Sequence, residues 1–141
     1  MSTTGLEVFD TTVQKTHIWL KDIMQALGWE DRHKAYLGLR TTLHALRDRL
    51  TPEEAAQFGA QLPMLIRGLY YEGWTPTGKP GKVRHKAAFL TPIRDHFRDD
   101  WHVEPEEIAR AVLQVLARHV SAGEIEDIKQ LLPQELKELW C

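Results

Sequence analysis

The fold of this chain is decided by a stretch that reads TPEEAAQFGAQLP, residues 51–63. The hydroxyl of Thr51 can accept a hydrogen bond from a backbone N–H of the first helical turn, and Glu54 follows three residues later, which is the pattern of a capping box. Pro52 suits the first helical position, where no backbone N–H is needed. Pro63 would break a helix from inside and therefore indicates the start of another. The stretch predicts two short successive helices.

The same signals return seventy residues later, where Ser121 and Glu124 repeat the helix start and Pro133 repeats the second proline. Sliding the chain by seventy residues without a gap aligns further positions, most of them on apolar helix faces. The aligned pairs are Val13 with Val83, Leu20 with Leu90, Ile23 with Ile93, Arg40 with Arg110, Leu43 with Leu113, Leu46 with Leu116, Leu62 with Leu132 and Leu69 with Leu139. Self-similarity at one fixed offset indicates a duplicated structural unit.

Apolar residues recur at helical spacing in both halves, and no segment alternates as an exposed strand does. We expect the first helix to run from an N-cap at Asp10 to a stop at Gly28, and the second to begin near Asp31. Their tight connection predicts antiparallel packing. The prediction is an all-α fold of two tandem repeats of a four-helix unit, about eight helices, related by a pseudo-two-fold axis. The repeats are expected at residues 9–74 and 79–141, joined by a Pro/Gly loop at 75–81, within a single domain 1–141.

Composition restricts the classes of function. The formal net charge of −2 gives no global positive field, which argues against nonspecific nucleic-acid binding. The single cysteine, Cys141, excludes an intramolecular disulfide and fits a reducing cytoplasm. The beginning of the chain lacks the basic and apolar regions of a signal peptide, and no apolar run reaches the ~20 residues that span a bilayer. We expect a cytoplasmic protein with no membrane partner.

Six segments spread over both halves carry a family resemblance: residues 16–20 (THIWL), 28–33 (GWEDRH), 46–50 (LRDRL), 61–68 (QLPMLIRG), 70–74 (YYEGW) and 119–127 (HVSAGEIED). With them the chain resembles, along nearly its whole length, the bacterial domain-of-unknown-function family 2267. It implies a helical, cytoplasmic bacterial protein and brings no catalytic residues with it.

Two acidic–histidine spacings are candidates for a metal site. Glu30 and His33 stand three apart, and Asp99 and His102 repeat the spacing in the second half. This spacing places a carboxylate and an imidazole on one helix face, as in helical di-iron proteins. The alternative is that acidic residues stabilise the positive N-terminal end of a helix. The apolar stripes lack the further inward glutamates that a di-iron site needs.

The junction between the halves carries aromatic and basic residues together. Tyr71 and Trp74 belong to the run YYEGW, residues 70–74. These rings either pack on the core or form an anchor for a partner, because Tyr and Trp are enriched at binding hot spots. Basic residues follow at Lys79, Lys82, Arg84 and Lys86. They are either solvated or bind an acidic surface, an anion or a nucleic-acid backbone.

Motifs for nucleophilic catalysis, phosphate loops and dinucleotide binding are absent from the sequence. We therefore expect a non-enzymatic helical module, without a cofactor, that binds another protein or itself through the aromatic and basic junction. One alternative is a metal or small-ligand site between the two repeats, at Glu30, His33, Asp99 and His102. A further alternative is nucleic-acid binding through the basic junction.

Overall fold

The computed structural model describes residues 3–79, 84–100 and 102–140 of the chain. Every regular element within these residues is helical, so the all-α prediction is confirmed. The elements are α1 (Glu7–Leu27), α2 (Arg32–Arg47), α3 (Pro52–Gly59), α4 (Met64–Tyr71), α5 (Lys86–His96), α6 (Pro105–His119), α7 (Ala122–Leu131), α8 (Gln134–Lys137) and a closing 3-10 turn, η1 (Glu138–Trp140).

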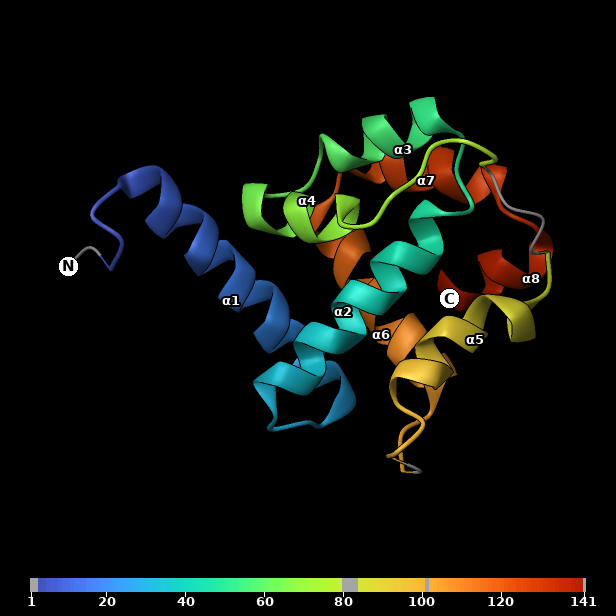
Figure 1. Cartoon of the computed structure of the whole chain (residues 1–141), viewed down its shortest axis with the longest axis horizontal. Coiled ribbons are helices and arrows are strands. Elements are labelled where there is room, and N and C mark those ends of the chain that lie inside the picture. The colour runs from blue at the N-terminus through green and yellow to red at the C-terminus, as the bar shows by residue number, and fades with distance from the viewer. Residues whose placement is uncertain (1–2, 80–83, 101, 141) are drawn as a thin grey trace.

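Helices α2 and α6 pack against each other at the centre of the molecule (Figure 1). Helix α1 lies against both of them, and α5 also lies against both. Helix α4 packs on α2 and α1, while η1 packs on α6 and α8 packs on α5. A side-chain hydrogen bond from Gln57 on α3 to Glu124 on α7 links two helices from opposite halves of the chain.

The two halves share one hydrophobic core. Ile23, Leu39 and Leu43 from the first half and Ile108 and Val112 from the second are fully buried within one continuous cluster. Each burial of an aliphatic side chain of this size stabilises the folded chain by about 1.5–3 kcal/mol before entropy is counted. The chain therefore forms a single compact domain of eight α-helices in the part that the structure describes.

Local sequence signals set several helix ends, as predicted. Thr51 and Glu54 form the reciprocal capping box at the start of α3. Asp31 caps α2 by accepting the N–H of Lys34, and Ser121 caps α7 by accepting the N–H of Glu124. Gly28 ends α1 with a positive φ of 69°, a conformation that side chains with a Cβ rarely adopt.

The predicted start of the first helix was wrong. Helix α1 begins at Glu7, and Leu6 occupies the N-cap position. Asp10 lies inside the first turn, and its carboxylate instead accepts hydrogen bonds from the backbone N–H groups of Thr3 and Thr4. An acidic residue suits the whole first turn as well as the cap, so its presence does not fix the first residue. The correction adds Val8 and Phe9 to the helix.

Candidate functional site

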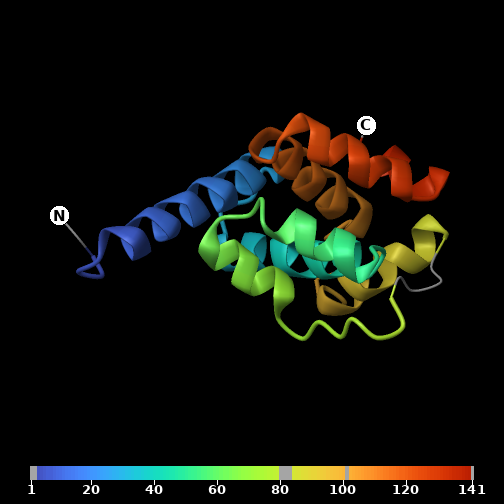
Figure 2. The same cartoon turned by 90° about the horizontal axis from the view of Figure 1, so that it is seen from above.

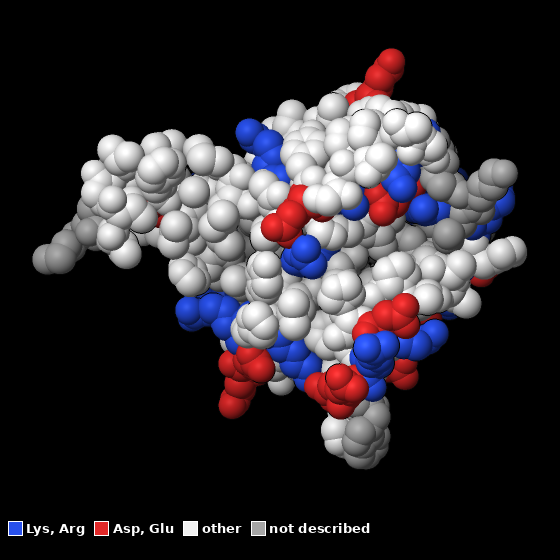
Figure 3. All heavy atoms as spheres, in the orientation of Figure 1, with Lys and Arg blue, Asp and Glu red and all other residues white. Residues whose placement is uncertain are grey.

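The N-terminal part of α1 projects away from the rest of the molecule (Figures 1 and 2). We call residues 6–13 the α1 arm. Three large apolar side chains of the arm are exposed: Leu6 is 54% exposed, Val8 53% and Phe9 44%. The charged residues of the arm are Glu7 and Asp10, both acidic. Figure 3 shows the projecting arm with very little charge on this face, whereas charged groups of both signs gather on the body.

The arm continues the face of α1 that packs into the core. Phe9, Thr16 and Ile23 follow one another at intervals of seven residues, which is two helical turns with a drift of only about 20° per step. Thr16 and Ile23 are buried, but Phe9 is exposed. The apolar face is therefore longer than the surface that covers it.

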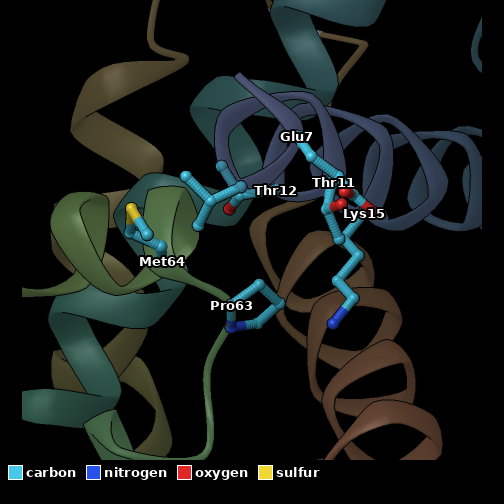
Figure 4. Close-up of a pocket in the computed structure, with 7 residues that line it drawn as sticks. Glu7, Thr11, Thr12, Lys15, Pro63 and Met64 are labelled. Atoms are coloured by element: carbon cyan, nitrogen blue, oxygen red, sulfur yellow. The ribbon is translucent and has the colours of Figure 1, made fainter.

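A groove runs between α1 and the start of α4 beside the arm. Its volume is about 550 Å³. It is lined by Glu7, Val8, Thr11, Thr12 and Lys15 of α1 and by Pro63 and Met64. Figure 4 shows the α1 side chains on one side of this α1–α4 groove and Pro63 and Met64 on the other. Thr12 joins the two helices, because its side-chain oxygen accepts the backbone N–H of Leu65 at 2.9 Å.

A second hollow, which we call the basic pocket, shares Lys15, Pro63 and Met64 with the groove and has a volume of about 450 Å³. Its apolar lining residues are Ile18, Trp19, Leu62, Pro63 and Met64. Lys15 of α1, Arg67 of α4 and His119 at the end of α6 also line it, together with Gln61. Its lining, as far as the described residues go, includes no carboxylate.

The aromatic residues of the predicted junction pack on their own chain. Tyr71 and Trp74 are partly buried against the core, and their ring centroids lie 5.5 Å apart. The Tyr71 ring also meets Tyr70 edge-on at 4.9 Å. The indole Nε1 of Trp74 is buried without a hydrogen-bond partner among the residues that the structure describes. Tyr71 and Trp74 therefore lie at the edge of the hydrophobic core rather than on an exposed binding surface.

The basic residues of the junction are mostly balanced by acidic neighbours. The Nζ atom of Lys79 lies 3.9 Å from Asp48 Oδ1, and the Nζ atom of Lys86 lies 3.1 Å from Glu106 Oε1. Hydrogen bonds from Arg110 and Lys86 hold the pKa of Glu106 below its usual value. Arg84 is exposed, and Lys82 lies outside the described residues. The junction therefore presents less free positive charge than its sequence indicates.

The four residues of the predicted metal site do not form a ligand cluster. Glu30, His33, Asp99 and His102 are all exposed. His33 lies beside the ring of Tyr36, with centroids 5.7 Å apart. The neighbouring Asp100 pairs with Lys34 at 2.8 Å, and this hydrogen bond lowers the pKa of Asp100. Across residues 3–79, 84–100 and 102–140, no three histidine, cysteine or acidic side chains gather as metal ligands would.

Sequence reasoning missed the arm, the groove and the basic pocket. An N-cap at Asp10 places Val8 and Phe9 before the helix, although Phe9, Thr16 and Ile23 stand seven residues apart, the spacing of one helix face. The basic pocket gave no such signal, because Lys15, Arg67 and His119 are far apart in the chain. Only the packing of α1 against α4 and α6 brings them together.

None of the helices that the structure describes has the length and apolar character needed to cross a bilayer. No curated protein matches the chain. One family model does match, over residues 16–139, and its description is "Uncharacterized conserved protein (DUF2267)". The match covers most of the chain and includes all six segments that carry the resemblance, so the protein belongs to the DUF2267 family.

Proposed function

We propose that this protein is a non-enzymatic helical interaction module that self-associates through the α1 arm. The observation that carries the proposal is the apolar face of α1, which is buried at Thr16 and Ile23 and continues uncovered to Phe9. Burying a side chain such as Phe9 contributes about 1.5–3 kcal/mol, so an uncovered continuation of a core face favours a partner. This surface replaces the aromatic and basic junction as the first candidate.

Exposed apolar groups concentrate around the arm. Of the seven large hydrophobic side chains that are exposed among the described residues, five lie at this end of the molecule. They are Leu6, Val8 and Phe9 on α1, and Met64 and Leu65 on α4. The hydrogen bond between Thr12 and Leu65 holds the two helices together here, so these side chains form one neighbourhood. Contiguous apolar patches with polar edges are typical of interaction sites.

The charges along α1 favour a second copy as the partner. The helix carries Glu7 and Asp10 in its first turn, and its first basic residues are Lys15 and Lys21. Two α1 helices packed antiparallel through their arms bring the acidic beginning of each helix toward Lys15 of the other. A two-fold contact of this kind needs only one self-complementary patch per chain, and two-fold dimers are the commonest oligomers.

The test is the molar mass of the untagged full-length chain, measured by sedimentation equilibrium over a concentration series. We expect a monomer–dimer equilibrium for the wild type and a monomer for Phe9→Asp. The matched control is Leu131→Asp, which places the same charge at an apolar residue of similar exposure, 47% against 44%, on α7. Circular dichroism should show unchanged helicity in both variants.

A charge exchange tests the orientation separately. Glu7→Lys and Lys15→Glu should each weaken the dimer, and the double variant should recover much of the lost affinity. A wild-type chain that stays monomeric at every concentration would reject self-association. A dimer that Phe9→Asp leaves intact would reject the arm as its interface.

We also propose that residues 9–74 and 79–141 are tandem repeats related by a pseudo-two-fold axis. The packing supports this, because exchanging α1 with α5, α2 with α6, and α4 with α8 and η1 taken together reproduces the main helix contacts. Thr51 and Ser121, seventy residues apart, cap equivalent helices. Positions 65 and 135 each take part in a hydrogen bond between the fourth and the first helix of their half. The backbone N–H of Leu65 donates to the side chain of Thr12, and the backbone N–H of Lys86 donates to the side chain of Glu135.

The single cysteine favours a cytoplasmic location for the protein.

A further inference from the structure

The basic pocket has the size and lining of a small-molecule site. Ligand pockets usually measure about 300–1,000 Å³, with apolar walls and a few placed polar groups. The basic pocket, at about 450 Å³, lies in this range and has walls from Ile18, Trp19 and Leu62. Phe9, the centre of the arm's apolar face, does not line it.

Arg67 is held in place by backbone groups. Its Nε donates to the carbonyl oxygen of Gly59 at 3.1 Å, and its Nη2 donates to that of Leu62 at 2.9 Å. These carbonyls lie at and just beyond the end of α3, where carbonyl groups lack partners within the helix. No carboxylate pairs with Arg67 or with Lys15 among the described residues. Both positive charges are therefore free to meet a bound anion.

His119 is fixed from two directions. Its ring stacks on the buried ring of Trp19, with centroids 4.9 Å apart and planes 19° apart. Its Nε2 lies 2.9 Å from Asp22 Oδ2. Because an ionised carboxylate only accepts, Nε2 carries the proton in this bond. A fixed ring loses little conformational entropy when a ligand binds beside it.

We propose that the basic pocket binds a small organic carboxylate with an apolar body. Arginine and lysine form charge-assisted hydrogen bonds with carboxylates, and these are about twice as strong as neutral ones. The apolar body of the ligand lies along Ile18, Trp19 and Leu62, while the carboxylate meets Lys15 and Arg67. Among the described residues, none that line the pocket is acidic, and the nearby Asp22 pairs with His119.

Octanoate, below the concentration at which it forms micelles, is the probe. Binding is followed by calorimetry and by the indole N–H resonance of Trp19 in proton–nitrogen NMR spectra. We expect octanoate to bind about tenfold more tightly than 1-octanol, which has the same chain without the charge, and octylamine not to bind. The Trp19 resonance should shift with octanoate.

Lys15→Glu should weaken octanoate binding about tenfold or more. The matched control is Lys21→Glu, a charge reversal at an exposed lysine of the same helix that does not line the pocket, and it should bind octanoate as the wild type does. Arg67→Lys, which keeps the charge but loses the hydrogen bonds that hold the guanidinium on Gly59 and Leu62, should give an intermediate loss and is checked for folding by circular dichroism.

Equal binding of octanoate and 1-octanol, or an unchanged affinity in Lys15→Glu, would overturn the proposal. So would the absence of octanoate binding to the folded wild type. The arm variant Phe9→Asp separates this site from self-association: it should lose the dimer and keep octanoate binding.

Discussion

The side-chain oxygen of Thr12 on α1 accepts a hydrogen bond from the backbone N–H of Leu65 on α4, at 2.9 Å. Helix α4 begins after Pro63, whose side chain cannot cap it. The first N–H groups of a helix need partners from outside the helix, and here α1 provides one. The bond crosses 53 positions of sequence and fixes the wall of the α1–α4 groove.

Thr12→Val should lower the free energy of unfolding by about 1 kcal/mol, the usual effect of losing a helix cap. Valine keeps the shape of threonine and removes the acceptor. Urea denaturation monitored by circular dichroism measures the change. Thr11→Val is the control, because Thr11 is exposed and makes no such cap. Equal effects of the two substitutions would contradict the capping role.

Gly59→Ala should destabilise the protein by about 1–3 kcal/mol, as overpacking usually does. A Cβ atom at Gly59 would lie 2.8 Å from the ring carbon Cζ of Tyr71 and 3.0 Å from Tyr70, with both rings packed on the core. Gly68→Ala is the opposite case, since a Cβ there meets nothing within 4 Å in the middle of α4. It should stabilise the protein by up to about 1 kcal/mol. Thermal unfolding of the two variants measures both changes in stability. A Gly59→Ala variant more stable than the wild type would show that the Tyr71 ring can move aside without cost.

Arg47→Met should be strongly destabilising. Arg47 is 4% exposed, and its Nη1 donates to the carbonyl oxygens of Tyr70 and Glu72 at 2.8 and 2.9 Å. Each buried acceptor that loses its partner costs about 1–3 kcal/mol. Arg40→Met is the comparison, because Arg40 pairs with the exposed side chain of Glu72, and such surface pairs contribute about 0–1 kcal/mol. Denaturant midpoints should fall much further for Arg47→Met, and similar midpoints would count against the buried network.

Glu124→Gln should make the protein more stable near neutral pH. Burial raises the pKa of Glu124, and the nearby Asp127 and Glu54 raise it further, against a hydrogen bond from Gln57 that lowers it. The folded chain therefore keeps this proton at pH values where the unfolded chain, with an ordinary pKa of 4.5, has lost it. The stability from this group is full below that pKa and is lost as pH rises through the higher folded pKa.

The measurement for Glu124→Gln is the free energy of unfolding as a function of pH. The advantage of the variant over the wild type should shrink as the pH falls toward 4.5 and below. Glu126→Gln, at an exposed position on the same helix, should follow the wild type. A Glu124→Gln advantage that does not change with pH would mean that burial of the charge is not its cause.

Some of the fold could be predicted because its causes are local. The capping box of Thr51 and Glu54 depends on four consecutive residues, and Gly28 ends α1 through its own backbone conformation. The start of α1 could not be fixed in this way, because Asp10 suits both a cap and a first turn. Because the predicted N-cap at Asp10 starts the helix too late, the sequence prediction places Val8 and Phe9 outside it and does not include the α1 arm.

The sequence by itself determined the all-α class, the family and several helix ends, since helical spacing and caps are properties of neighbouring residues. The tertiary structure decided where the free surfaces lie. It packed Tyr71 and Trp74 on the core, left Phe9 uncovered, and placed His119 beside Trp19 across a hundred residues of chain. Such contacts depend on how α1, α4 and α6 pack, and packing is a sum over the whole core that no single segment contains.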